Sequence, residues 1–156
     1  MGKGLGIHAE GVHIAFTAGT GVLGFLDLVA HLVRKNLGLL TMNDDLSINM
    51  KKFRLILYVA FPTKEDIIGF ELCKGLKDIN QALNKHNFEY NVRVSNQNEK
   101  LSKWDMYFID DVLNPYKSKI SKIWVCGPPK MNEDFDKALS KLALKYELKQ
   151  TQIEIM

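Results

Sequence analysis

Two glycine-bearing turns constrain the fold of this chain more than any other feature. Residues 17–24 read T-A-G-T-G-V-L-G, and residues 125–131 read V-C-G-P-P-K-M. Each turn follows an apolar, strand-like run and precedes a helical pattern. Because the carboxyl ends of the strands in an open α/β sheet form one ligand-binding crevice, we expect the two turns to meet there. The pair predicts a site for a large phosphorylated ligand that is held at two points.

The first turn has the spacing of a phosphate-binding loop. It follows residues 11–16, an almost continuous apolar run that is typical of a strand buried on both faces. Gly19, Gly21 and Gly24 then satisfy G-x-G-x-x-G, and glycine allows backbone N–H groups to approach phosphate oxygens closely. A helix is expected from Val22, and its N-terminal dipole favours an anion. A glycine turn without a ligand is the alternative.

This turn departs from two standard nucleotide motifs. The usual dinucleotide fingerprint carries an acidic residue about 20 positions later, to hold the ribose. Here the next expected strand, residues 53–60, ends much later and runs into Phe61, Pro62 and Thr63. An ATP-binding P-loop is excluded, because no Gly-Lys-Ser/Thr sequence follows the glycines.

The rest of the chain alternates between strand and helix patterns. Further strands are expected at residues 53–60, 88–94, 122–126 and 152–156, and helices at residues 64–85, 104–113 and 133–146, with Leu83 facing inward and Asn132 capping the last helix. Polar loops are expected at residues 41–52 and 96–103. Alternation of this kind predicts an α/β fold: a doubly wound, open parallel sheet of about five strands with helices on both faces. Residues 1–156 would form a single domain.

Composition narrows the classes of function. Hydrophobic residues make up 46% of the chain, which is enough for a substantial core, and the net charge of +3 is too small to indicate nucleic-acid binding. No apolar run approaches the roughly 20 residues that cross a bilayer. The two cysteines have neither metal-ligand spacing nor the number that a disulfide framework needs. We therefore expect no metal and a cytoplasmic location, or the cytosolic face of a membrane if other domains are fused.

The second turn combines a thiol, a glycine and two prolines. Gly127 would let a ligand ring approach the backbone, and Pro128 and Pro129 would stiffen the loop. Cys126 would lie at the mouth of the crevice. A packed, inert thiol is the usual state of a cysteine, whereas a nucleophile needs a nearby base or cation, and the sequence places none beside Cys126. Covalent catalysis by this thiol is therefore disfavoured.

Together these motifs resemble the pyridine-nucleotide domain of the ferredoxin–NADP reductase superfamily, which includes flavin-dependent cytochrome reductases and nitrate reductases. Residues 18–24 are similar to the G-G-T-G-x-x-P turn of that family, with Ala18 for the first glycine and Gly24 for the proline. Residues 126–131 match its C-G-P-P-x-M turn fully. Residues 63–72 are similar to its T-x-x-D-I…E-L stretch, so the resemblance covers essentially the whole chain.

The resemblance implies a site for NADH or NADPH. The residues implied to bind the pyrophosphate are Ala18, Gly19, Thr20, Gly21 and Val22; those at the nicotinamide are Cys126, Gly127, Pro128, Pro129 and Met131; and those bordering the adenosine are Phe61, Thr63, Ser95 and Asn96. Cys126 would be the catalytic residue, in the sense that it positions the nicotinamide ring. Relatives that use NADPH often have Ser-Arg where this chain has Ser95-Asn96, so NADH is favoured.

The same resemblance implies a flavin domain that this sequence lacks. Relatives carry an upstream flavin barrel with an R-x-Y-S/T motif, and no arginine here begins such a motif. Residues 1–10 are expected to be the tail of a linker from that domain. The chain would be the nucleotide-binding half of an NAD(P)H-flavin oxidoreductase, positioning NAD(P)H for hydride transfer to FAD on a separate domain, in cis or in trans. It would be inactive alone.

Two alternatives stay open. The chain could be a nucleotide-sensing or partner-docking module of the same fold that does not turn over substrate, because it lacks the flavin motif and its first turn is altered. It could also have a different α/β fold in which the two glycine turns are coincidental.

Overall fold

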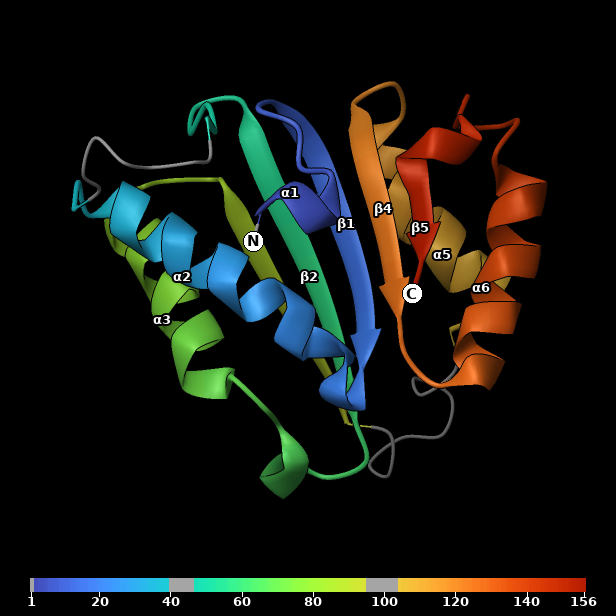
Figure 1. Cartoon of the computed structure of the whole chain (residues 1–156), viewed down its shortest axis with the longest axis horizontal. Helices are drawn as coiled ribbons and strands as arrows, with labels where there is room; N and C mark the ends of the chain where they lie inside the picture. Colours follow the sequence, from blue (N-terminus) through green and yellow to red (C-terminus); the bar gives the residue numbers. More distant parts are fainter. Residues whose placement is uncertain (1, 40–46, 95–103) are drawn as a thin grey trace.

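A single parallel sheet organises the molecule. The computed structural model describes residues 2–39, 47–94 and 104–156 (Figure 1). The strands are β1 (Gly11–Ala18), β2 (Phe53–Phe61), β3 (Phe88–Val94), β4 (Ile120–Cys126) and β5 (Ile153–Ile155), in the order β3-β2-β1-β4-β5. All four pairings are parallel. The expected doubly wound α/β fold is therefore confirmed, with its topological switch point between β1 and β4.

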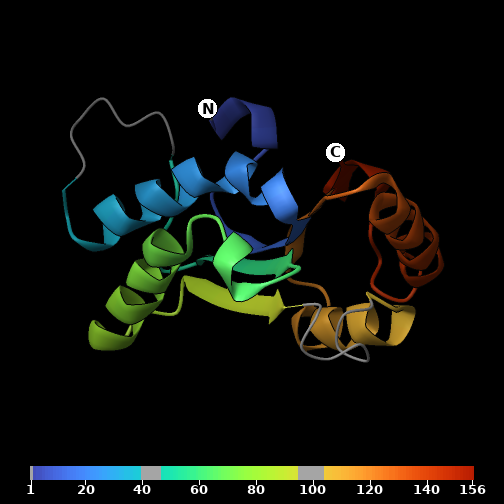
Figure 2. The same ribbon diagram turned by 90° about the horizontal axis from the view of Figure 1, so that it is seen from below.

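Helices cover both faces of this sheet (Figure 2). The α-helices are α1 (Gly2–Leu5), α2 (Leu23–Asn36), α3 (Phe70–Ala82), α5 (Met106–Leu113) and α6 (Pro129–Leu142). Short 3₁₀ turns are η1 (Gly19–Val22), η2 (Lys64–Asp66), η3 (Asn114–Tyr116) and η4 (Gln150–Gln152). Helices α2 and α3 pack on one face and α5 and α6 on the other. No helix within the described ranges is both long enough and apolar enough to cross a membrane.

Strand β1 is the centre of the sheet and is buried from Val12 to Thr17. Successive side chains point to opposite faces, so Ala15 packs in the core under α2 and α3, while Ile14 and Phe16 pack in the core under α5 and α6. Burial on both faces explains why this segment is an almost continuous apolar run.

The helix expected over residues 64–85 is shorter and interrupted. Residues Lys64–Asp66 form the 3₁₀ turn η2, and α3 begins only at Phe70, after Gly69. Gly69 has a left-handed φ of 73°, and a Cβ there would lie 2.6 Å from Cδ2 of Leu26 on α2. Glycine therefore both turns the chain and lets the start of α3 approach α2. Leu83 lies beyond the helix and is 47% exposed, so the inward orientation expected for it is wrong.

The last helix begins earlier than its apolar pattern indicates. Helix α6 starts at Pro129. Proline is favoured in the first helical turn, because an N–H group at that position would have no intrahelical acceptor. Asn132 is therefore not the N-cap; its side-chain amide donates to the carbonyl oxygen of Met156 at 2.8 Å. The loop expected at residues 96–103 lies outside the described residues, as does much of the one at residues 41–52.

The N-terminal segment is packed onto the sheet. The indole nitrogen of Trp124 donates to the carbonyl oxygen of Leu5 at 2.8 Å, and the backbone N–H of His8 donates to Nε2 of His13 at 3.0 Å. His13 is fully buried. The centre of its ring lies 4.6 Å from the ring centre of Phe53 and 5.6 Å from that of Trp124. This burial lowers the pKa of His13 to about 4.

The fold is predicted to lose stability in mild acid because of His13. The unfolded chain protonates this imidazole near its ordinary pKa of 6.5, whereas the folded chain resists protonation until about 4. The free energy of unfolding should therefore fall as the pH drops from about 6.5 to about 4, by about 3 kcal/mol from this residue. Urea unfolding of His13→Gln across that range should give a flatter pH profile than the wild type.

The exposed His86 provides the control. His86→Gln should keep the pH dependence of the wild type. If His13→Gln and the wild type show the same dependence, the folded chain does not resist protonation of His13.

Candidate active site

The two glycine turns lie side by side at the carboxyl edge of the sheet. Thr17 of β1 is in register with Cys126 of β4, so the chain leaves both strands at the same point. A Cβ on Gly21 would overlap the carbonyl oxygen of Cys126 and lie 2.8 Å from its carbonyl carbon. Glycine at position 21 is therefore what lets η1 pack against the end of β4.

The other two glycines of the first turn, Gly19 and Gly24, are not required by a close backbone contact. Gly19 has a left-handed φ of 58°, which favours glycine, and a Cβ there would meet nothing within 4 Å. Gly24 lies in the first turn of α2 with an ordinary backbone, and a Cβ there would also meet nothing within 4 Å. Open space thus lies beside Gly19 and Gly24, and a backbone contact lies beside Gly21.

The second turn packs against the helix that follows it. A Cβ on Gly127 would overlap the thioether sulfur of Met131 and lie 3.4 Å from the Cβ of Ala18. The sequence predicts that Gly127 leaves room for a ligand ring; in the structure, the space in its Cβ direction is filled by Met131. Met131 itself is buried, and Pro128 and Pro129 carry the chain directly into α6. The turn is therefore held rigidly between β4 and α6.

Two helical segments begin at this edge: η1, which continues into α2, and α6 (Figure 1). The residues before η1, α2 and α6 are Ala18, Val22 and Pro128, and none of them makes a side-chain capping hydrogen bond. The first turns of these elements contain no acidic residue. N–H groups in a first helical turn lack intrahelical partners and carry partial positive charge. The N–H of Leu23 already donates to the carbonyl oxygen of Thr20, and Pro129 has no N–H, so the donors that favour an anion at this edge are those of η1 and of the residues that follow Pro129.

Cys126 is half-buried beside this edge, and burial raises the pKa of its thiol. A raised pKa keeps the sulfur protonated and weakly nucleophilic near neutral pH. Within the described ranges, no group of three or more His, Cys, Asp or Glu side chains could hold a metal ion. The position and raised pKa of the Cys126 thiol suit non-covalent contact with a ligand better than nucleophilic attack on it.

The residues expected to border the adenosine differ in burial and in hydrogen bonding. Phe61 ends β2 and is buried, and Thr63 donates its hydroxyl to the carboxylate of Asp66 at 2.8 Å. The T-x-x-D part of the sequence thus forms the turn η2 itself, and the Thr63–Asp66 hydrogen bond spans it. Ser95 and Asn96 lie outside the described residues.

A cavity of about 960 Å³ opens between the end of β3 and the first turn of α3. Its walls are mainly apolar: Ile67, Phe70, Leu72, Val92 and Val94, with Lys64, Gly69 and Glu71. Phe70 is 37% exposed, which is unusual for an aromatic ring beside a core. No sequence motif indicates this cavity. The sequence signal that could have indicated the cavity is Phe70, an aromatic residue directly after Gly69 at the start of α3.

Comparisons with known proteins support the fold. Neither a protein-family model nor a curated protein matches the sequence. Among solved structures, ferredoxin-NADP+ reductase from Plasmodium falciparum aligns with 94% of this chain and 53% of its own, at a TM-score of 0.57 and 12% identity. The CS-b5R domains of human Ncb5or, in the NAD+ form, align with 94% of this chain and 37% of theirs, at a TM-score of 0.59 and 14% identity.

A third structure, a flavohemoglobin from Malassezia yamatoensis with bound FAD and heme, aligns with 99% of this chain and 33% of its own. Its TM-score is 0.58 and its identity 13%. The chain thus has the fold of one part of these proteins and spans about half of their length or less. The resemblance that the two turns indicated is confirmed at the level of the fold.

The different surroundings of the glycines predict opposite effects of substitution. Gly21→Ala forces a methyl group against the Cys126 backbone and should cost roughly 1–3 kcal/mol of unfolding free energy. Gly24→Ala meets open space inside a helix and should be neutral or stabilise by up to about 1 kcal/mol. Urea unfolding of both variants measures the difference. Equal stability of the two would show that η1 does not pack against β4.

Proposed function

We propose that this chain is the nicotinamide-nucleotide-binding half of a flavin-dependent oxidoreductase. It would hold NADH or NADPH so that a hydride passes to FAD on a separate domain. One observation carries the proposal: at the switch point of a reductase-like fold, Gly21 brings the phosphate-type turn into contact with Cys126 of the C-G-P-P-x-M turn. Ligands of open α/β sheets bind at such switch points.

The first turn offers what a pyrophosphate needs. Its uncapped N–H groups, the absence of acidic side chains in the first helical turns and the open space beside Gly19 fit a doubly charged anion. In this proposal residues 18–22, Ala18 to Val22, hold the pyrophosphate mainly through the backbone. The exposed Thr20 adds a hydroxyl group that can donate.

The second turn would position the nicotinamide. The nucleotide supplies the hydride chemistry, and the protein supplies binding and orientation. Cys126 and Gly127 would contact the ring, while Met131 and the two prolines hold their backbone in place. The protonated Cys126 thiol acts as a soft, weakly polar contact that fixes the distance to the acceptor, and hydride transfer is sensitive to shifts of about 1 Å.

The apolar cavity beside Phe70 suits the adenine. A flat aromatic ligand would lie against Phe70 and Val94, with Lys64 at the rim. Phe61 and Thr63 would then act indirectly, because one is buried and the other is bonded to Asp66. Ser95 and Asn96 remain proposed neighbours of the ribose.

The flavin would come from a partner domain, in cis or in trans. The chain corresponds to about half or less of its structural neighbours, one of which is described with bound FAD. Cys73 and Cys126 are both free thiols, which fits the proposed cytoplasmic setting.

A nucleotide-sensing module without turnover is the second candidate. It is favoured by Ala18 and Gly24, which stand where the resembling reductases carry glycine and proline. The two candidates share the nucleotide site and differ in whether a flavin is reduced.

Fusing a flavin domain upstream should separate the candidates. The chain alone should bind no FAD and show no NADH-dependent ferricyanide reduction, whereas the fusion should reduce its flavin in stopped-flow experiments. In the fusion, Cys126→Ser should slow flavin reduction on the order of 100-fold with little change in nucleotide affinity. Cys73→Ala, at the buried thiol of α3, is the matched control and should keep the wild-type rate.

Three results would count against the enzymatic role: stoichiometric flavin on the chain alone, no reduction in the fusion, or an unchanged rate in Cys126→Ser. The second of these would favour the sensing module.

NADH should bind more tightly than NADPH. The 2′-phosphate of NADPH is best bound by an arginine fork, and Asn96 stands where an arginine would be expected. Arg93 is engaged elsewhere, since its guanidinium lies 4.1 Å from the ring centre of Phe108 and 4.6 Å from that of Trp104. Calorimetry with both nucleotides at low and high salt measures the preference. Tighter binding of NADPH that weakens with salt would contradict it.

A further inference from the structure

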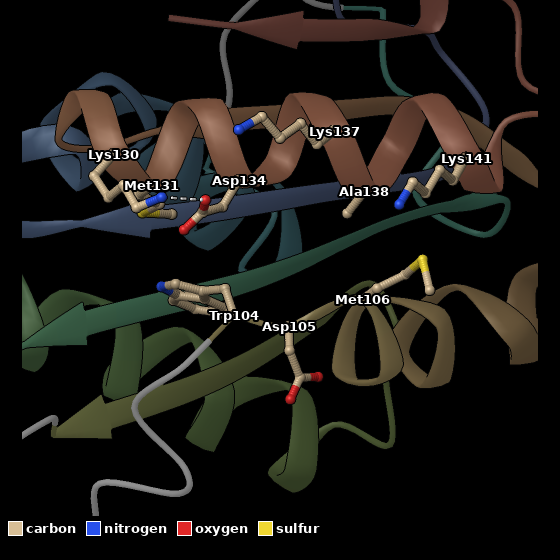
Figure 3. A pocket seen from close by; sticks show the side chains of 9 residues that line it. All are labelled: Trp104, Asp105, Met106, Lys130, Met131, Asp134, Lys137, Ala138 and Lys141. Atoms are coloured by element: carbon tan, nitrogen blue, oxygen red, sulfur yellow. Dashed lines mark hydrogen bonds and ion pairs between the residues drawn. The ribbon is translucent and has the colours of Figure 1, made fainter.

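A groove of about 650 Å³ lies between α5 and α6, on the face of the sheet opposite α2 and α3 (Figure 3). Its apolar surface comes from Trp104 and Met106 on one side and from Met131 and Ala138 on the other. Methionine side chains adapt readily to ligands of different shape. The volume and the lining are those of a small-molecule site.

Trp104 forms a rigid platform in this groove. Its ring packs at 5.8 Å from Phe16, 5.6 Å from Phe108 and 5.7 Å from Phe135. The guanidinium of Arg93 lies over the same ring at 4.6 Å. A side chain fixed by so many neighbours loses little freedom when a ligand binds, so the groove is preorganised.

The charges around the groove favour an anion. Lys130 is paired with Asp134 at 2.9 Å, and Asp105 accepts a hydrogen bond from the backbone N–H of Phe108 at 2.8 Å. Lys137 and Lys141 also line the groove, and neither makes an ion pair with another described residue. Figure 3 shows the amine of Lys141 directed from α6 toward α5, and the carboxylate of Asp105 directed away from α6.

From these observations we propose that the α5–α6 groove is a second ligand site, for an elongated carboxylate with an apolar or aromatic body. The body lies on Trp104 between the two methionines, and the carboxylate binds Lys141. Lys137 stands one helical turn away, with its amine along α6 in Figure 3, and turns to meet the same carboxylate. The site is separated from the glycine turns by Met131, whose sulfur fills the space beside Gly127 on one side while the side chain lines the groove on the other.

The two tryptophans allow a test on the intact chain. Trp104 lines the groove, whereas Trp124 is fully buried and bonded to Leu5, so their indole N–H signals in NMR spectra report the site and the core separately. Titration with 2-naphthoate or with decanoate should shift the Trp104 signal saturably and leave the Trp124 signal in place. The better ligand of the two tells whether the groove takes an aromatic or an acyl body.

Charge variants complete the test. Lys137→Gln combined with Lys141→Gln should weaken binding of the probe by about tenfold, with the Trp124 signal confirming the fold. Lys77→Gln combined with Lys117→Gln, at two exposed lysines away from the groove, should bind as the wild type does. The proposal is overturned if the Trp104 signal does not move, if both double variants bind equally, or if NADH displaces the probe.

Discussion

The close approach of Gly21 to the end of β4 is the constraint on which the candidate site depends. Strands β1 and β4 are neighbours in the sheet although β2 and β3 lie between them in sequence. Only at this switch point can the turn after β1 touch the turn after β4. Because position 21 has no side chain, the backbone of η1 contacts the backbone of Cys126. Gly127 likewise lets the second turn pack against the side chain of Met131. The two turns and the start of α6 thus form one packed unit.

The periodic parts of the molecule could be predicted from the sequence. Strand β3 has the expected bounds, and the two turns meet as the α/β pattern requires. The sequence could not predict why glycine is needed at a particular position, because that depends on contacts with residues distant in sequence. Gly21 is needed for a contact with Cys126, and Gly69 for a left-handed turn against Leu26, whereas Gly24 has open space around it.

The roles of side chains that resemble ordinary core or surface residues could not be predicted from the sequence either. Phe70 is an apolar residue at the start of a helix, and only the fold shows that it lines an open cavity. His13 lies in a strand that is otherwise almost wholly apolar, and its burial depends on the N-terminal segment, which sequence motifs identified only as a linker. Lys137 and Lys141 fit the polar face of a helix, and only the position of α5 beside α6 places them at a groove.

Backbone amide NMR with NADH tests the central claim most directly, namely that the two turns form one nucleotide site. The amide signals of Gly19, Thr20 and Gly21 should shift together with those of Cys126 and Gly127, along one saturation curve, while the Trp104 indole signal and the Lys141 amide signal of the α5–α6 groove stay in place. Shifts confined to one of the turns, or no saturable shift at either, would contradict the claim.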